Sequence, residues 1–163
     1  MTGPAAVSGA GMLDQSPMGS LLRARYCVGR MSPPRPQVAV VDDEQSICIA
    51  LQRLIRSANM DVKTYPSGEA FLNSLENARP DCVVLDLHMP KLTGFDVQAR
   101  LAQLATRVPV IVITGHDTPE TRARAITNGA AAYLLKPVDD RMLLDAISEA
   151  IADRAAVDVR ELK

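Results

Sequence analysis

Polar residues stand at the ends of four short apolar runs in this 163-residue chain. The runs are rich in aliphatic residues, many of them β-branched, as is typical of strands buried in a parallel sheet. In open sheets of parallel strands, ligands bind outside the carboxyl ends of the strands. We therefore expect these polar side chains to meet at one edge of a sheet. They are Asp42, Asp43, Asp86, Thr114 and Lys136.

The chemistry of this set is that of a phosphoryl acceptor. Three carboxylates in one site repel one another and cannot all stay ionised without compensation. Mg²⁺ supplies that compensation where few carboxylates, water and a phosphoryl oxygen meet, while Lys136 adds a positive charge and Thr114 a hydroxyl donor. A carboxylate can itself attack a phosphoryl group and form an aspartyl-phosphate. The pattern predicts that Asp86 is phosphorylated.

Asp86 taken alone has a simpler interpretation, because an aspartate after a strand often turns the chain or caps the next helix. Its companions at the other strand ends favour the chemical role. A base-activated serine nucleophile is not indicated, because the chain has no Gly-x-Ser-x-Gly pattern.

Composition limits the kinds of partner. The formal net charge is −1 and 47% of the residues are hydrophobic, so no general affinity for nucleic acid or an anionic membrane is implied. No run approaches the roughly 18 to 20 apolar residues of a membrane span, and no secretory signal is indicated. Three scattered cysteines (Cys27, Cys48 and Cys82) form neither a disulfide framework nor a CxxC metal site. We expect Cys48 and Cys82 to be buried thiols in the reducing cytoplasm.

Five strand signals alternate with five helix signals from residue 37 onwards. Ser67, Thr93, Thr118 and Asp139 are suited to begin helices as N-caps, and Gly129 suits a left-handed C-cap. The alternation predicts an α/β fold, a doubly wound, five-stranded parallel sheet with right-handed crossovers. The flavodoxin-like strand order 2-1-3-4-5 sets the first strand beside the third, so the acidic residues that follow each would be neighbours.

The periodic pattern also suggests how the chain is divided. Residues 1–36 are rich in Gly, Ala, Ser and Pro and predict a flexible N-terminal extension. An alternative is an upstream start codon, because Met31 stands just before the ordered pattern. Residues 37–153 are expected to form the domain, and residues 154–163 a short C-terminal tail.

Four segments resemble the receiver domain of two-component response regulators, and they occur in the order of that family. They are Val41–Glu44, Leu85–Pro90 followed by Gly94, Ile113–Gly115, and Leu135–Pro137. Each segment alone is a weak signal, but their conjunction is specific. The resemblance covers about residues 37 to 153 and implies a CheY-like fold. It implies a signalling phosphoacceptor rather than an enzyme, with at most slow self-catalysed phosphorylation and dephosphorylation.

The resemblance assigns roles in the acidic pocket residue by residue. Asp86 matches the phosphoacceptor. Asp43 and Asp86, with the backbone carbonyl of His88, match the Mg²⁺ ligands, and Asp42 matches the second acidic residue, which acts partly through water.

The resemblance also implies a set of switch residues. Lys136 matches the lysine that pairs with the phosphoryl group, and its bond to Pro137 is expected to be cis. Thr114 matches the hydroxyl that moves towards the phosphate, and Tyr133 the aromatic switch residue. The alternative for Tyr133 is a core ring with a hydrated hydroxyl.

The two histidines of the chain, His88 and His116, each stand two residues beyond a site residue. In receivers those positions flank the phosphoryl group and influence access of the hydrolytic water. We therefore hypothesise that both residues set the lifetime of the phosphorylated state. The alternative is a pair of solvated loop imidazoles. Zinc binding by the pair is disfavoured, because a carboxylate-rich site prefers harder ions.

The resemblance implies a sensor histidine kinase as the phosphoryl donor. The surface formed by the fourth helix, the fifth strand and the fifth helix would then bind a downstream protein or a second copy of the chain. No recognition helix or basic stripe is visible, so direct binding to nucleic acid is not expected, nor is membrane binding.

Two alternatives remain at the level of function. The chain resembles receivers that precede helix-turn-helix domains, so it could be the receiver fragment of a DNA-binding transcriptional regulator rather than a stand-alone receiver. An enzyme alternative makes Asp86 the nucleophile of a dehalogenase-type phosphatase. Those enzymes require a second acid two residues after the nucleophile, where this chain has His88. Their nucleophile also follows the first strand, whereas Asp86 follows the third.

Overall fold

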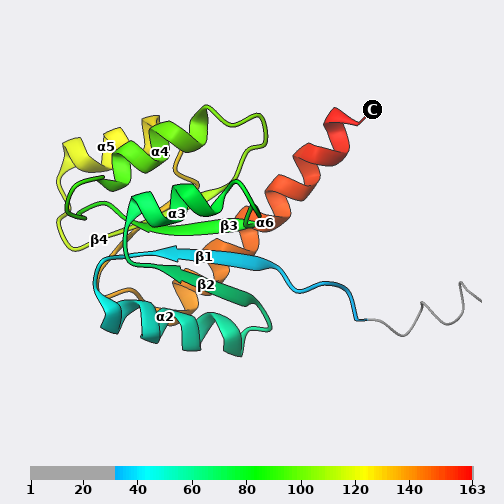
Figure 1. The fold of residues 1–163 in the computed structure, drawn as a ribbon, viewed down its shortest axis with the longest axis horizontal. Coiled ribbons are helices and arrows are strands. Elements are labelled where there is room, and N and C mark those ends of the chain that lie inside the picture. The colour runs from blue at the N-terminus through cyan, green and yellow to red at the C-terminus, as the bar shows by residue number, and fades with distance from the viewer. Residues whose placement is uncertain (1–31, 163) are drawn as a thin grey trace, which may run out of the picture. The chain divides into compact units, whose positions relative to one another are not determined.

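Five parallel strands form the centre of the part of the chain that the computed structural model describes, residues 32–162 (Figure 1). The strand order is β2-β1-β3-β4-β5, which confirms the predicted topology. The predicted N-terminal extension lies almost wholly outside the described residues, as does Cys27. The strands are β1 Gln37–Val41, β2 Asp61–Tyr65, β3 Cys82–Asp86, β4 Val110–Thr114 and β5 Ala132–Leu135.

Helices cover both faces of the sheet (Figure 1). Helices α2 and α6 pack on one face, and α3, α4 and α5 pack on the other. Successive strand residues point to opposite faces, and both faces are covered, so β3 and β4 are buried along their whole length and β1 along nearly all of it. The helices are α2 Gln45–Ser57, α3 Gly68–Ser74, α4 Gly94–Ala102, α5 Pro119–Thr127 and α6 Asp140–Glu161.

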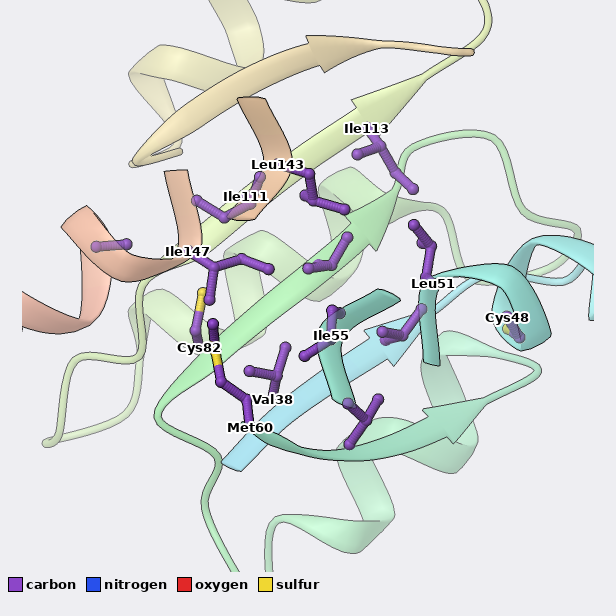
Figure 2. Packing of buried hydrophobic residues seen from close by; sticks show 14 residues of the cluster. Val38, Cys48, Leu51, Ile55, Met60, Cys82, Ile111, Ile113, Leu143 and Ile147 are labelled. Atoms are coloured by element: carbon purple, nitrogen blue, oxygen red, sulfur yellow. The ribbon is translucent and has the colours of Figure 1, made fainter. Parts of the chain in front are cut away.

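The core beneath α2 and α6 is continuous across the sheet (Figure 2). Leu51 and Ile55 of α2, with Leu143 and Ile147 of α6, point onto the central strands. Cys82 lies in this core and Cys48 at its margin, and both are buried free thiols, as predicted. Burial raises the pKa of Cys82 to about 12, so this thiol is protonated at neutral pH.

The predicted helix starts are confirmed at the level of single hydrogen bonds. The side chains of Ser67, Thr93, Thr118 and Asp139 each accept a hydrogen bond from the backbone N–H three residues later. Each bond satisfies a donor that would otherwise be unpaired in the first turn. At the other end of α5, Gly129 takes a left-handed conformation with φ +94°, as the C-cap prediction required.

Helix α6 is longer than the sequence pattern suggested. Residues 154–161, which we expected to be a tail beyond the domain, continue the helix to Glu161. Arg154 ties this extension to the domain, since its Nη1 donates to the carbonyl oxygen of Pro80 at 3.0 Å.

None of the described helices is long and apolar enough to cross a membrane. The predicted domain boundaries stay predictions.

Gly94 brings the loop after β3 against the strand end that carries Asp86. Its N–H donates to the carbonyl oxygen of Leu87 at 3.1 Å. A Cβ at this position would lie 2.4 Å from the backbone oxygen of Asp86 and 2.7 Å from the Cα of Leu87. Those contacts are with backbone, which cannot move aside without shifting the strand end, so the loop requires glycine here.

We predict that Gly94→Ala lowers the free energy of unfolding by about 1–3 kcal/mol, because the added methyl group overpacks the β3–α4 junction. Urea unfolding followed by circular dichroism measures the change. Gly115→Ala is the matched control, since a Cβ there would meet no atom within 4 Å. Equal stability of the two variants would contradict the close packing described for Gly94.

Candidate functional site

Three carboxylates meet at the carboxyl ends of β1 and β3. The two strands are neighbours, with Val41 paired in register with Leu85, so the residues that follow them lie together. Carboxylate oxygens of Asp42, Asp43 and Asp86 all lie within 4.8 Å of one another. Asp42 and Asp86 are buried and Asp43 is exposed. The structure thus assembles the acidic cluster where the strand order predicted it.

Lys136 directly follows β5, and its side chain extends into this cluster. Its Nζ donates to Oδ2 of Asp42 at 2.8 Å and lies 3.5 Å from Oδ1 of Asp86. The bond between Lys136 and Pro137 is cis, as the resemblance implied. The N–H of Lys136 also donates to the carbonyl oxygen of Thr114 at 2.8 Å, which continues the β4–β5 pairing to the site.

The charges of the cluster do not balance. Burial, and next the charge of Asp42, raise the pKa of the Asp86 carboxyl group above its usual value. Burial alone would lower the pKa of Lys136, but its hydrogen bond to Asp42 and the charge of Asp86 raise it overall. Lys136 therefore stays protonated, and one cation faces three carboxylates.

This donor set fits a hard divalent cation. Carboxylate oxygens that converge within a few ångströms are the ligands preferred by Mg²⁺, and one of the three is accessible to solvent, which leaves a route of entry. The backbone N–H of His88 donates to Oδ1 of Asp86 at 3.3 Å, which fixes that carboxylate at the start of the β3–α4 loop.

Thr114 is the last residue of β4, and its side chain is fully buried. Its hydroxyl oxygen lies 3.1 Å from Nδ1 of His88, donates to the carbonyl oxygen of His116 at 3.1 Å and accepts from the N–H of His116 at 3.1 Å. A hydroxyl has one proton and two lone pairs, so all three contacts are satisfied together when Nδ1 of His88 carries the proton and donates.

His88 and His116 lie against each other above this hydroxyl. Their ring centroids are 5.1 Å apart, in an edge-to-face arrangement with an interplanar angle of 72°. Both side chains are exposed. The structure therefore brings the two histidines together and ties one of them to Thr114, a contact that their positions in the sequence did not reveal.

Tyr133 lies farther along the same region, on β5 opposite Val112 of β4. Its hydroxyl is buried and has no hydrogen-bond partner among the described residues. The guanidinium carbon of Arg122 lies 5.3 Å from the ring centroid, and Arg122 forms an ion pair of 2.7 Å with Asp117. Sequence reasoning missed Asp117 and Arg122, whose only signal was opposite charge flanking the start of α5.

Comparison with known proteins identifies the family of this fold. Residues 38–148 match the family model described as the response regulator receiver domain. This chain belongs to that family.

Two relatives with similar sequences are named as regulators. The receiver is 36% identical to the response regulator protein TmoT of Ectopseudomonas mendocina over 121 residues, which is 74% of this chain and 55% of TmoT. It is 34% identical to the transcriptional regulatory protein FixJ of Rhizobium meliloti, over 74% of this chain and 61% of FixJ. The receiver thus spans only part of both relatives.

A solved receiver domain from Clostridium thermocellum matches the fold. It is 31% identical and superposes with a TM-score of 0.70, covering 75% of this chain and 98% of that one. The observed strand order and the five helices are those of the CheY-like receiver fold. Receivers are signalling modules that bind Mg²⁺ in an acidic pocket, and this receiver has carboxylates assembled in such a pocket.

We predict that Mg²⁺ stabilises the folded receiver, because the cation relieves repulsion that the unfolded chain does not have. At a concentration about ten times the dissociation constant, the free energy of unfolding rises by about 1.4 kcal/mol. Asp43→Asn is expected to abolish most of that increment. Thermal unfolding with and without MgCl2 measures it, and Asp145→Asn, an exposed substitution on α6, is the control. An equal increment in both variants would contradict a role for Asp43 in holding the cation.

Proposed function

We propose that this receiver accepts a phosphoryl group on Asp86 from a sensor histidine kinase and signals through the resulting change of its surface. One observation carries the proposal: the Asp86 carboxylate is 3% exposed and lies 3.5 Å from Lys136 within the acidic cluster. Burial and the charge of Asp42 both disfavour the charged form of Asp86, so the aspartate does not stabilise the fold by its charge. A perturbed carboxyl group of this kind is typical of a functional site. Membership of the receiver family supports the same role.

The proposed reaction is an in-line phosphoryl transfer. A carboxylate oxygen of Asp86 attacks the phosphorus, the bond between phosphorus and the donor nitrogen of the kinase histidine breaks, and its electron pair leaves with the imidazole. Lys136 faces the charge that develops on the phosphoryl oxygens. Mg²⁺, held by Asp43, Asp86 and the backbone carbonyl of His88, with Asp42 acting through water, would shield those oxygens from the carboxylates.

Phosphorylation would then change the partners of the switch residues. It adds nearly two negative charges and three acceptor oxygens at Asp86. Thr114 would exchange its contacts with His88 and His116 for the phosphoryl group, and Tyr133 would change its packing. Tyr133 lies in β5, which α5 precedes and α6 follows along the chain, so the surface of these three elements would be biased between two states.

The α5–β5–α6 surface is suited to bind a protein partner. Three large apolar side chains are exposed on it, one from each element: Ile126 at 57%, Leu135 at 45% and Met142 at 58%. Exposed aliphatic residues of this size favour contacts with another protein. We propose that a downstream protein or a second copy of the receiver binds there, in the cytoplasm, where buried free thiols such as Cys82 persist.

One specific observation favours a second proposal about context. The receiver spans 55% of TmoT and 61% of FixJ, which is named a transcriptional regulatory protein. This receiver could therefore serve as the phosphorylated part of a DNA-binding regulator. The phosphatase alternative gains no support, because Asp86 ends β3 rather than the first strand and His88 takes the place of the second acid.

Acetyl phosphate with Mg²⁺ tests the proposed acceptor. Wild-type protein is expected to gain about 80 Da per molecule, the mass of one phosphoryl group, and Asp86→Asn to gain none. Intact mass spectrometry measures the gain, with Asp81→Asn, which directly precedes β3, as the control. An unmodified wild type, or an equal gain in Asp86→Asn, would overturn the proposal.

We further propose that His88 and His116 set the lifetime of the phosphorylated state. Their rings lie in contact at the exposed mouth of the site, and His88 holds the Thr114 hydroxyl. Substitution changes both the access of the hydrolytic water and the freedom of Thr114.

We predict that His88→Asn and His116→Glu each change the rate of phosphate loss several-fold. The rate depends exponentially on the free-energy barrier to hydrolysis, so the loss of a positioned side chain changes it measurably. The decay of phosphorylated protein by mass spectrometry measures the rate. Glu120→Gln, exposed at the start of α5, is the control. Rates equal to wild type in both histidine variants would refute the assignment.

A further inference from the structure

The loop that follows β4 is clamped to the first turn of α5 by an ion pair. Nη2 of Arg122 donates to Oδ2 of Asp117 at 2.7 Å, and Nε donates to Oδ1 at 3.4 Å. Two donors of one guanidinium thus engage both oxygens of one carboxylate. This paired geometry fixes the plane of the guanidinium as well as its position.

The fixed guanidinium lies over the ring of Tyr133. The distance from the guanidinium carbon to the ring centroid is 5.3 Å, within the range of a cation–π interaction. Tyr133 is half-buried against the core under α4 and α5, and its hydroxyl has no partner among the described residues. The Asp117 carboxylate nevertheless lies near this hydroxyl, since burial and next Asp117 raise the pKa of Tyr133 above its usual value. Asp117 therefore acts at the hydroxyl end of the ring, while Arg122 lies over its face.

The same loop is anchored at the phosphorylation site. The Thr114 hydroxyl exchanges two hydrogen bonds with the backbone of His116, and His116 directly precedes Asp117 in the chain. A displacement of Thr114 therefore pulls on the residue next to the ion pair. Thr114, the 116–117 backbone, Arg122 and Tyr133 form one continuous set of contacts from the site to β5.

We propose that Arg122 is a positioning residue that couples the loop after Thr114 to Tyr133. In the unphosphorylated receiver, Asp117 holds Arg122 over the ring and so favours the ring position seen in the structure. When Thr114 moves to the phosphoryl group, Asp117 moves with the loop, Arg122 is redirected and the ring loses its restraint. The inference rests on the proposed function, because it describes how the phosphorylated site would reach the α5–β5–α6 surface.

The alternative is an ordinary surface ion pair. The side chains of Arg122 and Asp117 are 51% and 30% exposed, and exposed pairs contribute little to stability. Arg122→Gln is therefore expected to fold normally, which makes the variant usable. A stability measurement cannot separate the two accounts, but the environment of Tyr133 can, because a simple surface pair leaves the ring unaffected.

The matched control lies on the same helix. Arg124 also stacks over an aromatic ring, with its guanidinium carbon 4.1 Å from the ring centroid of Phe95 on α4. It touches neither Asp117 nor Tyr133 in the described contacts. Arg124→Gln therefore removes an equivalent charge and an equivalent cation–π contact from α5 without touching the proposed coupling.

The test uses the 163-residue protein labelled with 3-fluorotyrosine and fluorine NMR. The Tyr133 signal is assigned by its loss in Tyr133→Phe. Beryllofluoride with Mg²⁺ serves as the phosphoryl mimic, and its own bound fluorine signal reports occupancy of the site separately, with Asp86→Asn as the empty reference.

We expect wild type and Arg124→Gln to show the same large shift of the Tyr133 signal when beryllofluoride binds. Arg122→Gln and Asp117→Asn are each expected to move the unliganded signal towards the liganded position and to lose most of the shift. The double variant should behave as Asp117→Asn does, because Asp117 holds Arg122 over the ring.

The outcomes separate the coupling from the proposed function. If wild type binds beryllofluoride and Arg122→Gln shifts as wild type does, the coupling is overturned and the phosphoacceptor stands. An Arg124→Gln variant that loses the shift equally would also overturn it, since the effect would then belong to the charge of α5 in general. If wild type shows no bound beryllofluoride signal, the proposed function and the coupling fall together.

Discussion

Repulsion among carboxylates at one edge of the sheet is the constraint on which the rest of this receiver depends. Asp42 and Asp86 are both buried, and burial disfavours a charged group unless an opposite charge or a hydrogen bond meets it. Lys136 contacts both residues from the end of the edge strand β5, 94 residues along the chain from Asp42. The strand order and the close packing at Gly94 hold the ends of β1 and β3 in place beside one another.

The same constraint links the site to the surface. One lysine cannot balance three carboxylates, so the site favours a bound cation, and in the proposed function a phosphoryl group on Asp86 would change this balance of charge. The Thr114 hydroxyl already contacts the ring of His88 and the backbone of His116. In the proposed function, a phosphoryl group on Asp86 would compete with those partners for the hydroxyl and so alter the loop that precedes α5.

The fold and the members of the site could be predicted from the sequence because each left a local signal. Asp86 and Thr114 end apolar strands, and parallel strands place their carboxyl ends together. Thr93 and Asp139 cap helices through bonds to their own neighbours, which depend on three or four residues only. The cis bond before Pro137 followed from the family resemblance rather than from the residues themselves.

The contacts that could not be predicted depend on how loops pack. The bond between Thr114 and His88 joins the ends of two strands, and the position of Arg122 over Tyr133 depends on where the first turn of α5 meets β5. Neither contact has a periodicity or a fixed spacing. The extension of α6 to Glu161 was missed for a different reason. Its residues lack the regular spacing of apolar side chains, and Arg154 contacts Pro80, which is distant in the sequence.

The most direct test of the central claim is to identify the phosphorylated atom chemically. Protein treated with acetyl phosphate and Mg²⁺ is reduced with borohydride, which converts an aspartyl-phosphate into homoserine, and the peptides are sequenced by tandem mass spectrometry. This account predicts homoserine at position 86 and at no other aspartate of the acidic cluster. Homoserine at Asp42 or Asp43 instead, or none in the peptide that contains residue 86, would contradict it.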